Sequence, residues 1–359
     1  MTKRRKKTYN RRKRGRRKNQ RRCLSLKNSV ILMLVLLCIF FATRTDAWLA
    51  ENIQSVLVYV EQSAGIYPEL PEEGSLAGKL QAFLERVGTG RETAAHTEGE
   101  MEVHFLDVGQ GNACLVESEG HYMLVDGGDR DASSFVVAYL RDQGVEKLDY
   151  IIASHYDADH ISGLVGALNV YPTEKILCPD YATNTKIYAS LMKKIEENGC
   201  EVVHPAAGES YTLGEAVFTI VAPAADDYED DNNRSIGIRL VHGRSSFLML
   251  GDAEKESEAD ICSSGERLQS DVYLVSHHGS SSSTTEELLA RVRPSAAVIS
   301  AGEDNAYGHP HSQTMERLKA AGVQLYRTDI QETVIAVSDG EKLVWSQEPC
   351  MDFTPGDRQ

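Results

Sequence analysis

The chain has 359 residues, 42% of them hydrophobic, so it can form one large domain or two ordinary domains with a substantial core. Its net charge of −15 combines two unlike parts, because residues 1–27 contain 15 of the 38 Lys and Arg and no acid. The remainder has 23 basic against 53 acidic residues, a balance of −30 that argues against a processive nuclease tracking a polyanion.

The first 47 residues predict export. A basic tail, residues 1–27, precedes an uncharged segment whose fully apolar part, residues 30–42, suits a secretory signal and is short for a membrane span of about 20 residues. Residues 28–47 are therefore a signal peptide or a membrane anchor, and both alternatives stay open. The positive-inside rule leaves the tail in the cytoplasm and the rest outside, either secreted or anchored to the cell membrane. The competing interpretation of the tail is a nucleic-acid-binding or nuclear-localisation segment.

The remaining chain divides by composition. Residues 48–99 are rich in Pro, Gly and Glu and predict a stalk or linker, and residues 348–359 predict a flexible C-terminal tail. Between them, residues 100–347 alternate strand-like and helix-like patterns, which favours a layered α/β domain with the sheets inside. Strands are expected at 101–108, 113–118, 121–126, 148–155, 175–179, 201–205, 216–223, 236–243, 245–252, 271–280, 296–300, 324–328 and 332–346. Helices are expected at 133–144, 161–170, 186–199, 285–292 and 312–322.

The cysteine spacing predicts neither a disulfide framework nor a metal site. Five lie outside the export segment, no C-x-x-C pair occurs, and neither a zinc knuckle nor a set of disulfides is indicated.

A dense polar motif follows the strand predicted at 148–155. "HYDADH" places His155, Asp157, Asp159 and His160 where a strand gives way to a loop and helix. Burying such side chains is costly unless something pairs them, and a divalent metal does so. A solvated acidic turn is the alternative, but it explains neither the histidines nor the apolar strand before them.

Two later strands end in similar groups. "FLMLGD" ends in Asp252, whose carboxylate can bridge two cations, although a helix N-cap is the alternative interpretation. "DVYLVSHHGS" ends in His277 and His278, of which one is expected to be a metal ligand, with His277 preferred.

Two loops offer groups for a phosphoester substrate. "DDNNRS" presents Asn233 and Ser235 as hydrogen-bond donors, and "NAYGHPHS" presents Tyr307 and His309. Turn formation is the alternative for both.

These pieces, in this order, resemble the metallo-β-lactamase fold. "HYDADH" matches its H-x-H-x-D-H signature with Asp157 at the second histidine. Together with "FLDVGQGNACLV", "MLVDGG", "NNRSIGIRL", "FLMLGD", "LVSHHGS" and "NAYGHPHS" it resembles the hydrolase domain of ComEC-type competence proteins and their stand-alone relatives. The resemblance implies a four-layer αββα sandwich with a dinuclear metal site at one edge.

Site roles also follow from the resemblance. It makes His155 and Asp157 ligands of a first metal, Asp159 and His160 ligands of a second, Asp252 the bridging aspartate, and His277 or His278 the late ligand. The chain departs from the family at Asn112, where Asp is usual, and has no histidine at the usual mid-chain ligand position. Only one apolar segment is present, so DNA uptake is not implied.

The expected cofactor is a pair of divalent ions, Zn²⁺ or Mn²⁺ with Mg²⁺ possible, because Asp157 makes the ligand set richer in oxygen. The metals would produce a hydroxide nucleophile that Asp159 orients, Asn233 and Ser235 would stabilise phosphoryl charge, and His309 would protonate the leaving group. The hypothesis is a metal-dependent hydrolase, an extracytoplasmic phosphodiesterase or nuclease acting on DNA or on a small or envelope phosphoester. The alternatives are hydrolysis of a lactone, β-lactam or thioester, and a non-catalytic binding domain.

Overall fold

The computed structural model describes residues 99–357, so the predictions for residues 1–27, 28–47 and 48–98 lie outside the described residues. Within residues 99–357, no helix combines the length and apolar character needed to cross a membrane. The five cysteines of this part are all free thiols.

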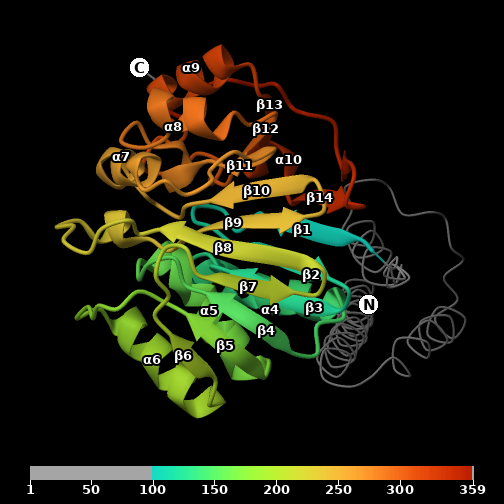
Figure 1. Cartoon of the computed structure of the whole chain (residues 1–359). Coiled ribbons are helices and arrows are strands. Elements are labelled where there is room, and N and C mark those ends of the chain that lie inside the picture. The colour runs from blue at the N-terminus through green and yellow to red at the C-terminus, as the bar shows by residue number, and fades with distance from the viewer. Residues whose placement is uncertain (1–98, 358–359) are drawn as a thin grey trace, which may run out of the picture. The chain divides into compact units, whose positions relative to one another are not determined.

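Two mixed sheets form the centre of the domain (Figure 1). The first has eight strands in the order β15-β14-β1-β2-β3-β4-β5-β6, with β3 to β6 parallel. The second has seven in the order β13-β12-β11-β10-β9-β8-β7, with β10 to β13 parallel. The strands of the first sheet are β1 (Met101–Phe105), β2 (Cys114–Ser118), β3 (His121–Val125), β4 (Leu148–Ile152), β5 (Thr173–Leu177), β6 (Glu201–Val203), β14 (Val334–Ser338) and β15 (Leu343–Trp345). Those of the second are β7 (Ser210–Leu213), β8 (Ala216–Ala222), β9 (Gly237–His242), β10 (Ser245–Met249), β11 (Val272–Leu274), β12 (Ala296–Ile299) and β13 (Gln324–Arg327).

Helices cover the outer face of each sheet, at the top and bottom of Figure 1. The first sheet is covered by α4 (Ser133–Asp142), α5 (Ala158–Val170) and α6 (Lys186–Asn198), and the second by α7 (Lys255–Ser263), α8 (Glu286–Val292) and α9 (Ser312–Ala321). Short turns of helix are η1 (Arg130–Ala132), η2 (Asp231–Arg234), η3 (Ser276–Gly279) and α10 (Thr328–Gln331). The predicted four-layer αββα sandwich is confirmed.

The alternating direction of the side chains along each strand explains the four layers. In β10, Phe247 and Met249 join the core between the sheets, whereas Leu248 joins the core under the helices. Successive side chains of a strand point to opposite faces, so a strand that is apolar on both faces needs a layer on each side. This is why these strands read as continuous apolar runs.

The parallel strands fix where a site can form. Carboxyl ends of parallel neighbours meet at one edge of a sheet, and the loops there can hold converging side chains. The loops after β8 and β10 leave the sandwich at the left edge in Figure 1, which is also where α5 and α6 begin. Residues far apart in the sequence therefore meet at this edge.

The C-terminal segment is not a free tail over residues 348–357, contrary to our prediction. The Arg327 guanidinium donates to the Thr354 carbonyl at 2.6 Å, and the Gly356 amide donates to the Pro310 carbonyl at 2.8 Å. The Asp357 carboxylate accepts from the Ser312 amide at 2.9 Å. The segment therefore supports the loop that precedes α9.

Helix α5 approaches the turn after β3 at backbone contact. A Cβ on Gly163 would lie 1.8 Å from the Gly127 carbonyl oxygen, and the Gly127 amide donates to the His160 carbonyl at 2.7 Å. Only glycine permits this approach, which fixes the start of α5 against the sheet.

We predict that Gly163→Ala lowers the free energy of unfolding by about 1–3 kcal/mol, because the added methyl group must push α5 away from Gly127. Urea denaturation followed by circular dichroism measures this. Gly166→Ala is the matched control, since the nearest atom to its new methyl group is the rotatable hydroxyl of Ser133. Equal stability of the two variants would contradict this account of the helix contact.

Candidate metal centre

His155 enters the site from the end of β4. Its side chain is fully buried, and its Nδ1 lies 3.1 Å from the Ser154 hydroxyl and 3.4 Å from the Ser235 hydroxyl. Its Nε2 is buried with no hydrogen-bond partner among residues 99–357. Burial, and then the charge of His160, lowers the pKa of His155 to about 4. The imidazole is therefore neutral near pH 7, and its Nε2 lone pair is available to a metal ion.

His160 connects the two sheets. Its Nδ1 donates to Asp126 at 2.8 Å, and its Nε2 lies 3.2 Å from Asp252 Oδ1. Burial disfavours the charged imidazolium, but the charges of Asp252 and Asp126 outweigh burial and raise the pKa of His160 well above its usual range. The surroundings of this ring therefore stabilise positive charge.

Asp252 follows β10 and lies at the centre of the cluster. Its Oδ1 faces His160, whereas its Oδ2 lies 3.4 Å from His278 Nε2. Burial raises its pKa, but the charges of His160 and His278 outweigh this and hold the pKa well below its usual range. The alternative interpretation as a helix N-cap does not hold, because Glu254 occupies that position of α7.

Of the two adjacent histidines, His278 belongs to the cluster, which corrects our preference for His277. His278 is only 3% exposed, its Nδ1 donates to the Ser300 carbonyl at 3.0 Å, and its Nε2 lies 3.4 Å from Asp159. His277 is 21% exposed and lies 3.7 Å from Asp252 and 3.3 Å from Glu254. Both have positive φ, 52° and 54°, so the chain reverses here and turns the second ring inward.

The first turn of α5 supplies the remaining carboxylates. The side chain of Asp159 is 25% exposed and contacts His278, whereas that of Asp157 is 62% exposed and lies 3.8 Å from His155 Nε2. Burial raises the pKa of Asp159, but a hydrogen bond from His278 and the charge of His160 outweigh it and lower the pKa. Asp157 therefore occupies the open side of the site.

The residues fit a divalent metal. Two sets, His155–His160–Asp252 and Asp159–His160–His278, each bring three ligand atoms within 4.8 Å of one another. Imidazole nitrogens and carboxylate oxygens are what divalent metals bind, and a cation would satisfy the buried Nε2 of His155. Asp157 and His277 lie beside these sets and are members of neither.

Comparison with known sequences decides the family. The sequence model described as "Metallo-beta-lactamase superfamily" matches residues 106–303, more than half of the chain. The chain belongs to this superfamily. Its fold implies binding of divalent metal.

Relatives of this superfamily member include three bacterial proteins. It is 28% identical over 253 residues to ComE operon protein 3 of Bacillus subtilis, covering 66% of this chain and 33% of that protein. It is 32% identical to competence protein ComA of Neisseria gonorrhoeae, and the match covers 65% of this chain and 32% of ComA. It is 31% identical to recombination protein 2 of Haemophilus influenzae, and the match covers 66% of this chain and 28% of that protein. The expected resemblance to ComEC-type proteins is confirmed, and the chain spans about a third of the length of these relatives.

Two predicted substrate-binding residues of this metallo-β-lactamase domain are not available to substrate. Asn233 is buried, and its side-chain carbonyl accepts from the Glu254 amide at 3.0 Å. Ser235 is also buried, and its hydroxyl accepts from the Asp252 amide at 3.2 Å. The prediction that they bind substrate is wrong, because both side chains turn inward and position the site.

Of the other two, Tyr307 lies at the surface, whereas His309 is buried, with 6% of its surface exposed. Tyr307 is 66% exposed, and its ring stacks on His309 at 5.6 Å between centroids. The His309 ring lies 5.6 Å from that of His277 and 6.1 Å from that of His278, and its Nδ1 is buried without a partner in residues 99–357. Burial, and then the charge of His278, lowers the pKa of His309 to about 3. The ring is thus neutral near pH 7 and donates only one N–H.

Asp126 is a site residue that we did not predict from the sequence. Besides His160, its carboxylate accepts from the Ser154 amide and hydroxyl, both at 2.8 Å. The signal was present in "MLVDGG", an apolar strand that ends in a single acid, as "FLMLGD" does. Asn112, the departure from the family, contributes its backbone, since its amide donates to the Asp159 carbonyl at 3.1 Å.

We predict that Asp126→Asn weakens metal binding about 10–100-fold, because the Nδ1 proton of His160 loses its charged acceptor. Competitive titration of the full-length protein with Mn²⁺ or Zn²⁺ measures the affinity. Asp149→Asn is the control, since Asp149 is also buried but lies at the start of β4 and accepts from the Tyr122 amide. Asp126 has no role in ligand orientation if both variants bind metal like the unmodified protein.

Proposed function

We propose that the domain is a metal-dependent phosphodiesterase acting outside the cytoplasm, with a nucleic acid or a small phosphodiester as substrate. The observation that carries the proposal is the convergence of His155, His160, His278, Asp159 and Asp252 at one sheet edge. The names of the relatives, competence and recombination proteins, favour a nucleic-acid phosphodiester over other substrates. Two bound divalent ions, Zn²⁺ or Mn²⁺, would supply a water of lowered pKa and stabilise negative charge on the phosphoryl group.

The residues of the chain do the rest. Asp126, Ser300 and Ser235 hold the rings of His160, His278 and His155, so that little reorganisation is needed during the reaction. Asp157 and Asp159 are the carboxylates that face outward, where a water and a phosphoryl group would meet. His309, being neutral, would donate its single N–H to a leaving or non-bridging oxygen rather than act as a charged acid.

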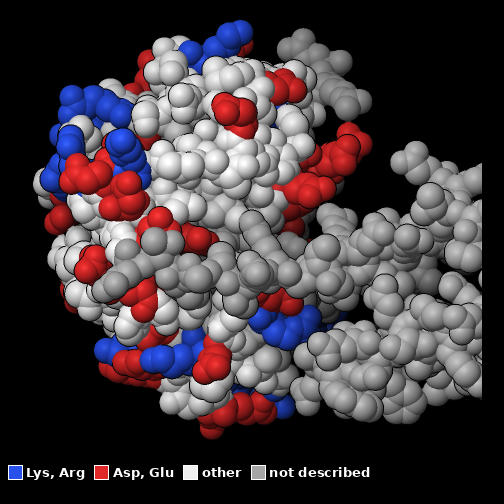
Figure 2. Space-filling view, turned by 90° about the vertical axis from the view of Figure 1, so that its right-hand side faces the viewer, with Lys and Arg blue, Asp and Glu red and all other residues white. Residues whose placement is uncertain are grey.

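The charge of the domain limits the class of substrate. Residues 28–359 contain 23 basic against 53 acidic side chains. Figure 2 shows the side of the domain that faces away from the site edge, and there acidic and basic side chains are interspersed around an uncharged area. A long nucleic acid needs many basic contacts to offset its charge. A short single-stranded end or a small diester therefore suits this domain better than a duplex.

The activity test uses the full-length protein loaded with Mn²⁺ or Zn²⁺ and three substrates: bis-p-nitrophenyl phosphate, single-stranded DNA and nitrocefin. We expect diester cleavage, and we expect Asp252→Asn to lower kcat/KM at least about 100-fold because the carboxylate between the two ligand sets is lost. Asp142→Asn, at an exposed position near the end of α4, is the control. Turnover of nitrocefin alone would indicate a different bond as target, and metal binding without any turnover would indicate a binding domain.

We further predict that His309→Gln lowers kcat on bis-p-nitrophenyl phosphate by about 10²–10³-fold while metal content stays unchanged. His311→Gln is the neighbouring control, because the His311 ring is already engaged by the Ser281 amide at 2.9 Å and the Tyr307 carbonyl at 3.1 Å. An unchanged kcat in His309→Gln would remove this residue from the mechanism.

A further inference from the structure

Arg234 is a cation placed beside the metal centre. In the segment Asn233–Ser235 the two flanking side chains are buried, whereas the side chain of Arg234 is 33% exposed. Its Nε and Nη2 donate to the Tyr228 carbonyl at 2.9 and 2.6 Å. The guanidinium carbon lies 5.3 Å from the centre of the Tyr181 ring. The group is therefore fixed in position without being buried.

Two neighbours of Arg234, Ser235 in the chain and Tyr181 in space, contact His155 or the residue after it. Ser235 follows it in the chain, and the Ser235 hydroxyl lies 3.4 Å from His155 Nδ1. Tyr181 packs edge-on against Tyr156, the residue after His155, at 4.8 Å between centroids. Figure 1 shows the loop between β5 and α6, which carries Tyr181, and the loop between β8 and β9 at the same edge. Arg234 thus belongs to a loop whose next residue contacts His155, and it packs on a ring that contacts the residue after His155.

The guanidinium has binding capacity left over. Arginine has five N–H groups, and the Tyr228 carbonyl takes two of them. The other three N–H groups have no hydrogen-bond partner in the part of the chain that the structure describes. Arg234 forms a long ion pair with Asp231, in which Nε and the carboxylate Oδ1 are 3.8 Å apart. A purely structural arginine would use its donors inside the protein. This one keeps a free edge that matches the oxygens of a phosphate.

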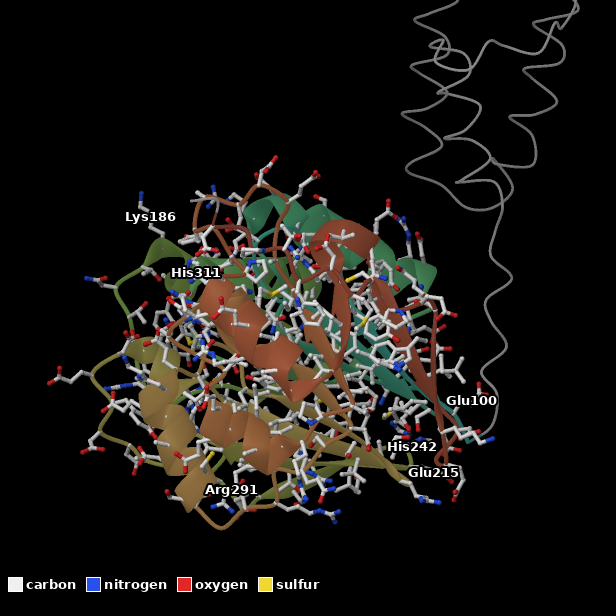
Figure 3. All side chains as sticks on the ribbon, turned by 90° about the horizontal axis from the view of Figure 1, so that it is seen from above. Glu100, Lys186, Glu215, His242, Arg291 and His311 are labelled. Atoms are coloured by element: carbon white, nitrogen blue, oxygen red, sulfur yellow. The ribbon has the colours of Figure 1, made fainter. Side chains whose placement is uncertain are left out.

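The residues around Arg234 in the sequence are mostly acidic. Residues 226–231 contain five acidic side chains, and Asp157 also lies on the open side of the site. An anionic substrate approaching there meets these acidic side chains, and Arg234 is the one basic residue in the segment 224–235. Lys186, at the start of α6, points away from the domain in Figure 3. A substrate that carries a second anionic group is the one for which this arrangement provides a partner.

We propose that Arg234, held over Tyr181, binds a second phosphate of the substrate, next to the phosphodiester that is cleaved. The inference rests on the proposed phosphodiesterase activity and makes it more specific: the preferred substrate carries a phosphate adjacent to the scissile bond, as an oligonucleotide does. A diester with a single phosphate is then cleaved without help from this residue.

The test compares matched dinucleotides. The full-length, metal-loaded protein is given thymidylyl-thymidine with one internal phosphate, and the same dinucleotide with an added 5′- or 3′-terminal phosphate. The unmodified protein is expected to show a lower KM for one phosphorylated form. Arg234→Gln is expected to raise that KM about 10-fold, with kcat and the KM for the unphosphorylated dinucleotide unchanged. Arg234→Lys, which keeps the charge but not the planar donors, should fall between the two.

Arg244→Gln is the control for loss of one positive charge. Arg244 lies in the turn between β9 and β10, next to His242, which Figure 3 shows across the domain from Lys186 and His311. If Arg234→Gln changes both KM values equally, or lowers metal content and the unfolding midpoint, the residue is structural and the inference is wrong. If the unmodified protein cleaves both dinucleotides with equal KM, the inference is also wrong. If it cleaves no diester, the proposed function fails, and the inference fails with it.

Discussion

The domain depends on one buried series of contacts, from Asp126 through the ring of His160 to Asp252. The two carboxylates come from different sheets, and the imidazole from the helix that starts between them. Removing either carboxylate would leave the others buried without compensation, at a cost of several kcal/mol. The same contacts that join the two halves of the sandwich therefore create an environment that attracts a cation, so both the stability of the domain and its metal binding depend on them.

Backbone geometry makes this arrangement possible. Glycines at 127 and 163 bring α5 close enough to the turn after β3 for Asp126 to reach His160. The left-handed conformations of His277 and His278 turn one ring toward the carboxylates and the other toward Glu254. Such conformations are uncommon for residues with a side chain and recur at functional sites.

Much of this could be predicted from the sequence because it follows from local patterns. Apolar runs that end in "HYDADH", "FLMLGD" and "SHHG" indicated strands whose carboxyl ends carry ligands, and the sandwich required by two-faced apolar strands is observed. What could not be predicted depends on orientation. Neither the inward ring of His278 nor the burial of Asn233 and Ser235 beside the partly exposed Arg234 is encoded by residue type. Which side chain points inward depends on the backbone conformation at a single position, and a sequence pattern does not predict a structure to within one residue. Asp126 was missed although "MLVDGG" has the same pattern as "FLMLGD", an apolar strand that ends in a single acid.

The central claim is that His155, His160, His278, Asp159 and Asp252 hold divalent metal. Anomalous diffraction from crystals of the protein grown with Mn²⁺ tests it most directly. The account predicts anomalous peaks about 2.0–2.3 Å from the Nε2 atoms of these histidines and from the carboxylate oxygens. Crystals that diffract well at saturating Mn²⁺ or Zn²⁺, yet show peaks only at surface carboxylates such as those of residues 226–231, would contradict it.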